Sequence, residues 1–173
     1  MAHVQCNGTV GKAVFDFHYE GVKDCLAASL LQGGPKQCRY GCLGQGTCVA
    51  KCPFGALTLS AENLPVVNLA RCTGCAVCAA VCPRGVIEMI PLSAHVEVNC
   101  NSGEKGVAAK QACSCACIAC TLCVKNCPHG AIRMENNLPV VDHAVCEEKC
   151  TDPTCISKCP TKAIQRRLSY KGE

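Results

Sequence analysis

The cysteines of this chain are arranged in four blocks, and every block ends in the dipeptide Cys-Pro. The blocks consist of Cys38, Cys42, Cys48 and Cys52; Cys72, Cys75, Cys78 and Cys82; Cys117, Cys120, Cys123 and Cys127; and Cys146, Cys150, Cys155 and Cys159. The second and third blocks share the spacing C-x2-C-x2-C-x3-C-P, and the first and fourth keep only its final interval. Any fold for this chain must therefore gather many thiols in a repeated way.

The abundance of cysteine leaves little ordinary material for a hydrophobic core. Cysteine accounts for 21 of the 173 residues, above the roughly 8–10% that marks cysteine scaffolds. Without cysteine the apolar residues make up roughly 37% of the chain, below the usual 45–50%, and there are three Phe, three Tyr and no Trp. Something other than large side chains must fill the interior. The length also excludes a closed eight-fold barrel of about 250 residues.

The context of the cysteines favours metal ligands over disulfides. The first residues lack the basic head, apolar centre and cleavage site of a secretory signal. The longest apolar run, Cys25–Leu31, is far shorter than the roughly 18–20 residues that span a bilayer. We therefore expect an intracellular, soluble chain without a membrane span. Because reducing compartments keep thiols free, spaced cysteines there indicate metal binding.

The compact spacing of the second and third blocks is that of bacterial ferredoxins, which bind 4Fe-4S clusters. Three cysteines of a run hold one cluster, and in two-cluster ferredoxins the fourth cysteine ligates the other cluster. The sequence thus predicts four 4Fe-4S clusters with crossed ligation. The predicted ligand sets are Cys38, Cys42, Cys48 and Cys82; Cys72, Cys75, Cys78 and Cys52; Cys117, Cys120, Cys123 and Cys159; and Cys146, Cys150, Cys155 and Cys127.

A longer repeat relates the two halves of the chain. The segment LPVV occurs at residues 64–67 and 138–141, and Cys72 and Cys146 follow the two copies at the same interval. Each half contains a cysteine block, a short hairpin through LPVV and a second block. We therefore predict an α+β fold of tandem duplicated, two-cluster bacterial ferredoxin-like modules, whose cores are filled by the clusters. Such modules are expected to be disordered without their cofactor.

The predicted domain limits follow from this repeat. Residues 38–92 form the first module and 113–168 the second, with a connecting strand or loop at 93–112 and a tail at 169–173. Residues 1–37 are predicted to be a small β-β-α addition. Apolar and mostly polar residues alternate from Ala13 to Glu20 as on a half-buried strand, and Val22, Leu26 and Leu30 recur at helical spacing before Gly33.

The sequence gives weaker support to other kinds of site. A structural zinc protein is the main alternative for paired cysteines, but four blocks with Cys-Pro ends and the compact triplets favour iron–sulfur clusters. The formal net charge of +4 falls to about −4 with four clusters of about −2 each, and the Lys and Arg residues are scattered, so nucleic-acid binding is not expected. No catalytic triad, phosphate loop or dinucleotide fingerprint occurs, so no substrate chemistry is predicted for the chain itself.

Five cysteines lie outside the blocks. They are Cys6, Cys25, Cys100, Cys113 and Cys115. The segments VQCNG around Cys6 and VNCNS around Cys100 resemble each other, and each is followed by a further cysteine, Cys25 or Cys113. These four residues are predicted to meet between the modules as a fifth metal site or as two close thiol pairs. The alternative is that they are small buried residues, as free cysteines commonly are.

Several motifs resemble those of B subunits of Rnf membrane complexes. They are KDCLAASLLQGG, GGPKQCRYGCLGQGTCVAKCPFGAL at residues 33–57, RCTGCAVCAAVCPRGVIEMIP at 71–91, VNCNSGEKG at 98–106, and ACIACTLCVKNCPHGAIRMENNLPVVD at 116–142. The resemblance covers nearly the whole chain. Family members carry a membrane anchor and another cysteine-rich domain ahead of this region, so the chain is expected to be a soluble part of such a subunit. The longer CEEKCTDPTC loop of the fourth block departs from the family pattern.

The resemblance implies a role in electron transfer. A B subunit of this family takes electrons from reduced ferredoxin at the cytoplasmic side of the cell membrane and passes them to membrane subunits of a ferredoxin:NAD oxidoreductase that moves sodium ions or protons. We therefore expect reduced ferredoxin and other subunits of the membrane complex as partners. A free-standing polyferredoxin that serves another oxidoreductase is the alternative within the same class.

Overall fold

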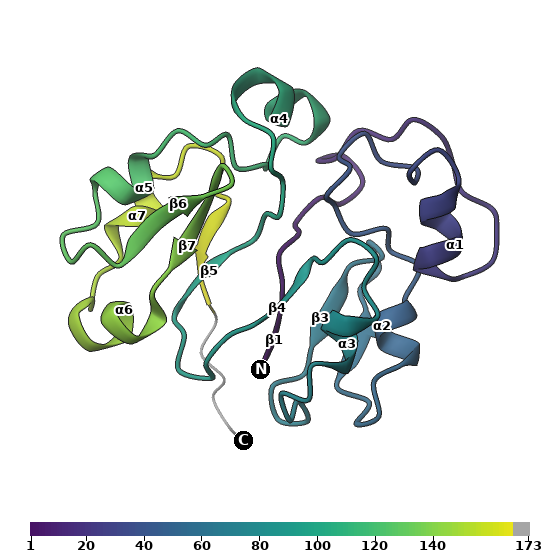
Figure 1. Ribbon diagram of the computed structural model, residues 1–173, viewed down its shortest axis with the longest axis horizontal. Coiled ribbons are helices and arrows are strands. Elements are labelled where there is room, and N and C mark those ends of the chain that lie inside the picture. The colour runs from purple at the N-terminus through teal and green to yellow at the C-terminus, as the bar shows by residue number, and fades with distance from the viewer. Residues whose placement is uncertain (168–173) are drawn as a thin grey trace.

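The computed structural model describes residues 1–167, so the predicted tail at 169–173 and residue 168 lie outside the described part. The described residues form two lobes, one from each half of the chain (Figure 1). The first half contains β1 (Ala2–Val4), α1 (Cys25–Leu30), α2 (Thr47–Ala50), β2 (Leu57–Leu59), β3 (Pro65–Val67), α3 (Val77–Ala80) and β4 (Ile87–Met89). The second contains β5 (Val96–Val98), α4 (Gly106–Ala112), α5 (Leu122–Lys125), β6 (Ile132–Glu135), β7 (Leu138–Val141), α6 (His143–Lys149), α7 (Thr154–Lys158) and β8 (Ile164–Arg166).

Four antiparallel strand pairs organise the two lobes. The hairpins predicted through the two LPVV segments are confirmed, because β2 pairs with β3 and β6 pairs with β7. The other two pairs join the first and last strands of each half: β1 pairs with β4, and β5 pairs with β8. Both lobes therefore consist of an outer strand pair, a hairpin and short helices that carry cysteines.

The outer strand pairs cross the predicted domain limits. Ala2 is opposite Met89, so a strand from the predicted N-terminal addition completes the first lobe. Val96 is opposite Arg166, so a strand from the predicted connection at 93–112 completes the second lobe. Each lobe is thus closed by residues that precede its first cysteine block.

The predicted strand from Ala13 to Glu20 is wrong. This segment makes only isolated bridges, Ala13 to Cys113 and Phe15 to Lys36, because no neighbouring strand runs alongside it. Its backbone bonds go to irregular chain, such as the 2.8 Å bond from the Asp16 N–H to the Pro35 carbonyl. The helix predicted after Gly21 is confirmed as α1, which begins at Cys25.

Cysteine side chains form much of each interior. The buried group of the first lobe includes Cys42, Cys48 and Cys78, and that of the second includes Cys123, Cys146 and Cys155. The largest fully buried side chains are only Ile164, Val86 and Val96. Among residues 1–167, no helix is both long and apolar enough to cross a bilayer.

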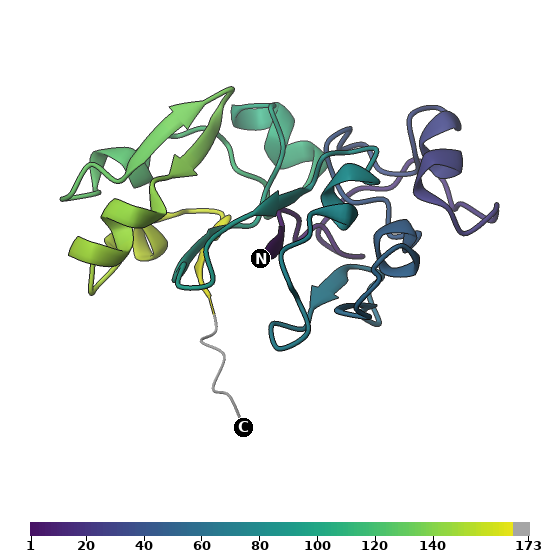
Figure 2. The same cartoon turned by 60° about the horizontal axis from the view of Figure 1, so that its bottom comes forward.

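The two lobes meet along the segments that follow β1 and β5. Figure 2 shows α4 and the chain near the N-terminus between the lobes. The Ala13 to Cys113 bridge joins the lobes here, and His3 Nε2 lies 3.1 Å from the Val98 carbonyl oxygen. Both lobes contribute cysteines to this junction, so a group of thiols lies between the two lobes.

Candidate metal centres

The loop before α3 gathers one predicted ligand set around a cavity. Cys72, Cys75 and Cys78 line a space of about 280 Å³ together with Cys52 from the end of α2. Gly74 (φ 76°) and Ala76 (φ 61°) are both left-handed, so the backbone turns sharply on each side of Cys75. The N–H groups of Ala2 and Ala56 approach the sulfurs of Cys72 and Cys52 at 3.5 and 3.3 Å.

The loop before α5 has the same construction in the second lobe. Cys117, Cys120 and Cys123 line a cavity of about 330 Å³, and Cys159 from the end of α7 completes the group. Ala119 (φ 56°) and Thr121 (φ 63°) again hold the backbone in the left-handed region on each side of the middle cysteine. In both lobes the fourth cysteine comes from the other block, as crossed ligation requires.

The cavity at α2 differs from its predicted set at one position. A space of about 350 Å³ is lined by Cys42, Cys48, Cys82 and Cys25. Cys38 instead lines a separate cavity between the lobes. The charges of Cys25 and Cys82 both contribute to raising the pKa of Cys48, after burial, which also places these thiols together.

The loop between Cys42 and Cys48 explains why the cavity at α2 is lined by Cys25 and not by Cys38. Gly44 (φ 75°) and Gly46 (φ 77°) reproduce the two left-handed positions of the other loops, but the residue between them is Gln45 instead of cysteine. The loop has therefore kept the ligand-binding backbone and lost its middle thiol. Alignment of Cys42 with Cys117 would have placed Gln45 opposite Cys120, and this signal in the sequence could have revealed the missing ligand.

Helix α1 supplies the replacement thiol and is attached to the site by its N-cap. The carboxylate of Asp24 accepts hydrogen bonds from the Ala27 N–H at 2.9 Å and from the Thr47 hydroxyl at 3.0 Å. The Thr47 oxygen in turn accepts the N–H of Cys25 at 2.7 Å. Since Thr47 immediately precedes Cys48, these bonds hold the two helices, and two of the four cysteines, against each other.

The fourth set forms around α6 and α7. The charges of Cys146, Cys127 and Cys150 all contribute, after burial, to the raised pKa of Cys155, which places the four predicted ligands near one another. His95 also lies here, because its ring nitrogen and the sulfurs of Cys146 and Cys150 are all within 4.8 Å of one another. This histidine was not singled out from the sequence, which has no ligand spacing around it.

Burial disfavours the thiolate form of several cysteines in these sets. It raises the pKa of Cys42 and Cys48 to about 12 and that of Cys123 to about 11. A thiolate in such a place needs a compensating cation, which a metal supplies. Thiols that converge on apolar cavities and face backbone N–H groups fit an iron–sulfur cluster, because its inorganic core fills the space and its sulfurs accept those N–H bonds.

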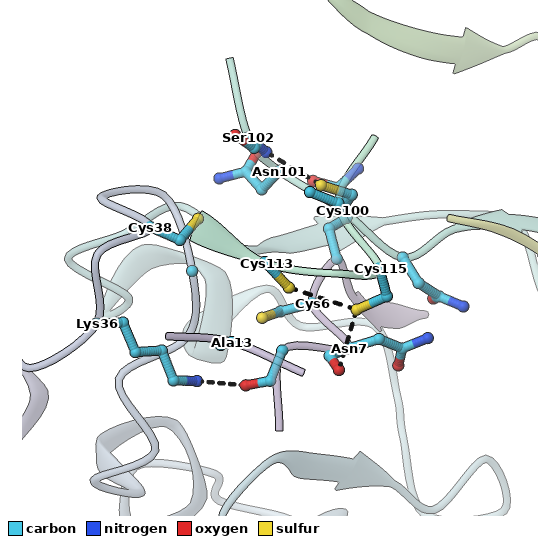
Figure 3. Close-up of a pocket in the computed structure, with 15 residues that line it drawn as sticks. Cys6, Asn7, Ala13, Lys36, Cys38, Cys100, Asn101, Ser102, Cys113 and Cys115 are labelled. Carbon is cyan, nitrogen blue, oxygen red and sulfur yellow. Dashed lines mark hydrogen bonds between the residues drawn. The ribbon is translucent and has the colours of Figure 1, made fainter. Parts of the chain in front are cut away.

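The remaining cysteines lie between the lobes (Figure 3). Cys6, Cys38, Cys100, Cys113 and Cys115 border one cavity of about 350 Å³. Three of the four residues predicted for a fifth site are present, and Cys38 stands where Cys25 was expected. A hydrogen bond from Cys115, whose sulfur is 3.5 Å away, lowers the pKa of the Cys113 thiol to about 6.

Part of the chain matches a known domain family, and nearly all of it matches known proteins. Residues 65–88, which contain Cys72, Cys75, Cys78 and Cys82, match the family described as a 4Fe-4S binding domain. The chain is 53% identical over 169 residues to the B subunit of a proton-translocating ferredoxin:NAD(+) oxidoreductase complex from Clostridium ljungdahlii, covering 98% of this chain and 59% of the relative. It is 41% identical to the B subunit of a Na(+)-translocating ferredoxin:NAD(+) oxidoreductase complex from Acetobacterium woodii, covering 98% and 50%.

A third relative comes from Methanosarcina acetivorans. It is the B subunit of an ion-translocating oxidoreductase complex and is 44% identical over 165 residues, which cover 95% of this chain and 61% of the relative. The chain therefore spans about half to three-fifths of the length of the curated relatives it matches. Over nearly all of its own length, this chain is similar to the B subunits of two ion-translocating ferredoxin:NAD(+) oxidoreductase complexes and of a further ion-translocating oxidoreductase complex.

Proposed function

We propose that this chain is an electron-transfer polyferredoxin, and that its two lobes are tandem copies of a two-cluster module. Each lobe holds two 4Fe-4S clusters by crossed ligation. The proposed ligands are Cys25, Cys42, Cys48 and Cys82; Cys52, Cys72, Cys75 and Cys78; Cys117, Cys120, Cys123 and Cys159; and Cys127, Cys146, Cys150 and Cys155. The observation that carries the proposal is the convergence of four thiols on each of three separate cavities.

The protein groups around these cavities suit one-electron transfer. A bound 4Fe-4S cluster accepts and releases single electrons, with a potential that depends on hydrogen bonds to sulfur, charge and exposure. The chain provides the thiolates and directs backbone N–H groups at their sulfurs. Buried apolar side chains such as Ala2, Ala56 and Leu57 limit the access of water to the sites. Electron transfer of this kind makes and breaks no bond to carbon, so it needs no acid–base residues at the sites.

The names of the relatives indicate the partners. Ferredoxin and NAD(+) are the two redox substrates in the names of two relatives, and all three are subunits of ion-translocating complexes. We propose that the chain accepts electrons from reduced ferredoxin at the cytoplasmic side of the membrane. It passes them to other subunits of a membrane complex that reduces NAD(+) and moves ions.

The cofactor is tested by anaerobic analysis of the purified chain. Iron and acid-labile sulfide should be present in equal amounts, at about four of each per cluster, and reduced ferredoxin should bleach the brown colour. A colourless chain that is well folded and contains zinc would refute the proposal. A brown chain that ferredoxin leaves oxidised would refute the proposed electron donor.

Crossed ligation is tested with serine variants. Cys52→Ser and Cys75→Ser should remove the same cluster, and Cys82→Ser and Cys48→Ser should remove a different one. A double variant within one set should lose about four irons, and a double variant across two sets about eight. Loss of the same cluster in Cys52→Ser and Cys48→Ser would refute the crossing.

A further inference from the structure

We propose that Cys6, Cys38, Cys100 and Cys113 bind a fifth 4Fe-4S cluster, between the two lobes. These residues come from four different segments, and in Figure 3 their side chains surround one space. The space they border is lined by four or more cysteines, as are the cavities at α2 and α5. A similar space lined by cysteines suits a similar occupant.

The four residues form two equivalent pairs, one from each lobe. Cys6 and Cys100 each stand two residues after the outer strand of their lobe, β1 or β5. Cys38 and Cys113 each stand four residues before the first cysteine of the next cluster loop. The site is therefore built from corresponding positions of the two lobes, which explains why neither lobe could complete it alone.

Backbone N–H groups are directed at these sulfurs as they are at the other cluster sites. The Cys42 N–H points to Cys6 Sγ at 3.3 Å, and the Cys117 N–H points to Cys100 Sγ at 3.2 Å. The Ser102 N–H also approaches Cys100 Sγ, at 3.5 Å. Such bonds stabilise thiolates that carry the negative charge of a cluster.

A glycine leaves room beside the cavity. A Cβ atom at Gly8 would lie 3.6 Å from the sulfurs of both Cys6 and Cys113 and 3.3 Å from the Cβ of Ala13. The bare backbone at this position therefore lets the chain pass close to two thiols that belong to different lobes.

A buried lysine supplies an independent indication of an anionic occupant. Lys36 lines the same cavity and is only 5% exposed. Its ammonium group donates to the Gly8 carbonyl at 2.7 Å and lies 5.4 Å from the centre of the Phe15 ring. Among residues 1–167 no carboxylate forms a salt bridge with it. A buried cation normally requires a negative partner, and a thiolate-ligated cluster of about −2 would provide one.

The spacing of the sulfurs does not match a single zinc ion. Tetrahedral zinc, with Zn–S bonds of about 2.3 Å, brings its sulfurs to about 3.8 Å from one another. In the described part of the chain, the one group of three or more potential ligands within 4.8 Å of one another is His95, Cys146 and Cys150. No three thiols of the central cavity are therefore as close together as a tetrahedral zinc ion would hold them.

Cys115 is the fifth cysteine at this cavity and is not assigned as a ligand. The equivalent position in the first lobe is Tyr40, so Cys115 has no counterpart in the pairing of the two lobes. Its sulfur contacts the Asn7 carbonyl oxygen at 3.4 Å and Cys113 Sγ at 3.5 Å. Cys115 is therefore outside the proposed ligand set.

The location suggests what the fifth cluster does. Cys42 donates an N–H bond to Cys6 and is a proposed ligand at α2. Cys117 donates one to Cys100 and is a proposed ligand at α5. A cluster here would lie between one site of each lobe and would connect them for electron transfer. This role rests on the proposed function, whereas the presence of the cluster does not.

Iron content of the complete chain tests the proposal directly. Five clusters predict about 20 irons and 20 acid-labile sulfides per anaerobically purified chain, and four clusters predict about 16 of each. A value near 16, or one near 16 with one zinc, would overturn the fifth cluster. Far lower iron would instead count against the proposed function.

Variants identify the ligands. Cys38→Ser and Cys100→Ser, alone or combined, should each lose about four irons while the spectra of the other clusters remain. The matched control Cys115→Ser, which keeps a hydrogen-bonding group beside the same cavity, should lose none. If Cys115→Ser loses iron and Cys113→Ser does not, the ligand set is wrong. Should a ligand variant fail to fold, the iron count of the unaltered chain still decides between four clusters and five.

Discussion

The site at α2 and the site at α5 share one loop design but obtain their third thiol differently. At α5 it is Cys120, an exposed residue in the middle of the loop. At α2 this position is Gln45, and the thiol comes from Cys25, a buried residue 20 positions away along the chain. The comparison shows that a loop can retain its backbone geometry when a ligand comes from another element.

The origin of the third thiol should also decide which parts of each lobe are stabilised by cofactor binding. Where the third thiol belongs to the loop, its ligation would hold only residues of that loop in place. Where it belongs to α1, ligation also attaches a separate helix to the lobe, through one thiol and the Asp24–Thr47 contact. The α2 site therefore couples cofactor binding to the structure of the N-terminal segment.

The largest expected effect comes from combining Cys82→Ser with a second substitution. If Cys25 and Cys82 hold one cluster, the variant Cys25→Ser/Cys82→Ser should lose about four irons, no more than either single variant. The variant Cys38→Ser/Cys82→Ser should lose about eight, because it affects two sites. Iron analysis of anaerobic preparations measures both. The reverse pattern would restore Cys38 to the α2 set and contradict the comparison.

A designed rescue should move the ligand back into the loop. In Gln45→Cys/Cys25→Ser, a thiol occupies the position of Cys120 between the left-handed residues Gly44 and Gly46. We expect this variant to regain most of the four irons lost by Cys25→Ser. The control Gln45→Ser/Cys25→Ser should regain none. Equal iron in the two double variants would show that the loop cannot present a ligand.

Cluster assembly should depend on pH at both sites. Burial raises the pKa of Cys42 and Cys48 to about 12 at α2, whereas at α5 it raises the pKa of Cys123 to about 11. These thiols are protonated at pH 7 and must release protons to bind metal, so assembly should improve as the pH rises. Reconstitution of Cys25→Ser and Cys120→Ser between pH 7 and pH 9 compares the sites. Both sites should fill faster at pH 9 than at pH 7, and a rate that falls as the pH rises would contradict the direction of these shifts.

A smaller effect is expected from removing the N-cap of α1. Asp24→Ala loses the bonds to Ala27 and Thr47, so Cys25 should be held less firmly and a chelator should extract the α2 iron several-fold faster. Asp142→Ala removes the corresponding cap of α6, where Asp142 accepts from the Val145 N–H. It should leave the α2 iron unchanged. Identical extraction kinetics in the two variants would exclude a specific role for Asp24.

Local patterns in the sequence were enough to predict the chemistry and most of the cysteines that the structure gathers around each cavity. The compact blocks carry their own spacing information, since three thiols in one tight loop can face only one cavity, and the structure gathers Cys72, Cys75 and Cys78 in that way. The LPVV repeats likewise predicted two hairpins, because hairpin pairing depends on residues close in sequence. The expected strand from Ala13 was wrong because alternation predicts a strand only if another strand pairs with it.

The different destinations of Cys25 and Cys38 could be identified only from the packing of the folded chain. Cys25 and Cys38 are separated by 12 intervening residues and both precede the first loop, so spacing cannot distinguish their destinations. The cap at Asp24 turns Cys25 towards α2, and the junction of the lobes brings Cys38 beside Cys6, Cys100 and Cys113. Such contacts depend on how whole elements pack, and the packing of distant elements is not encoded in any local pattern.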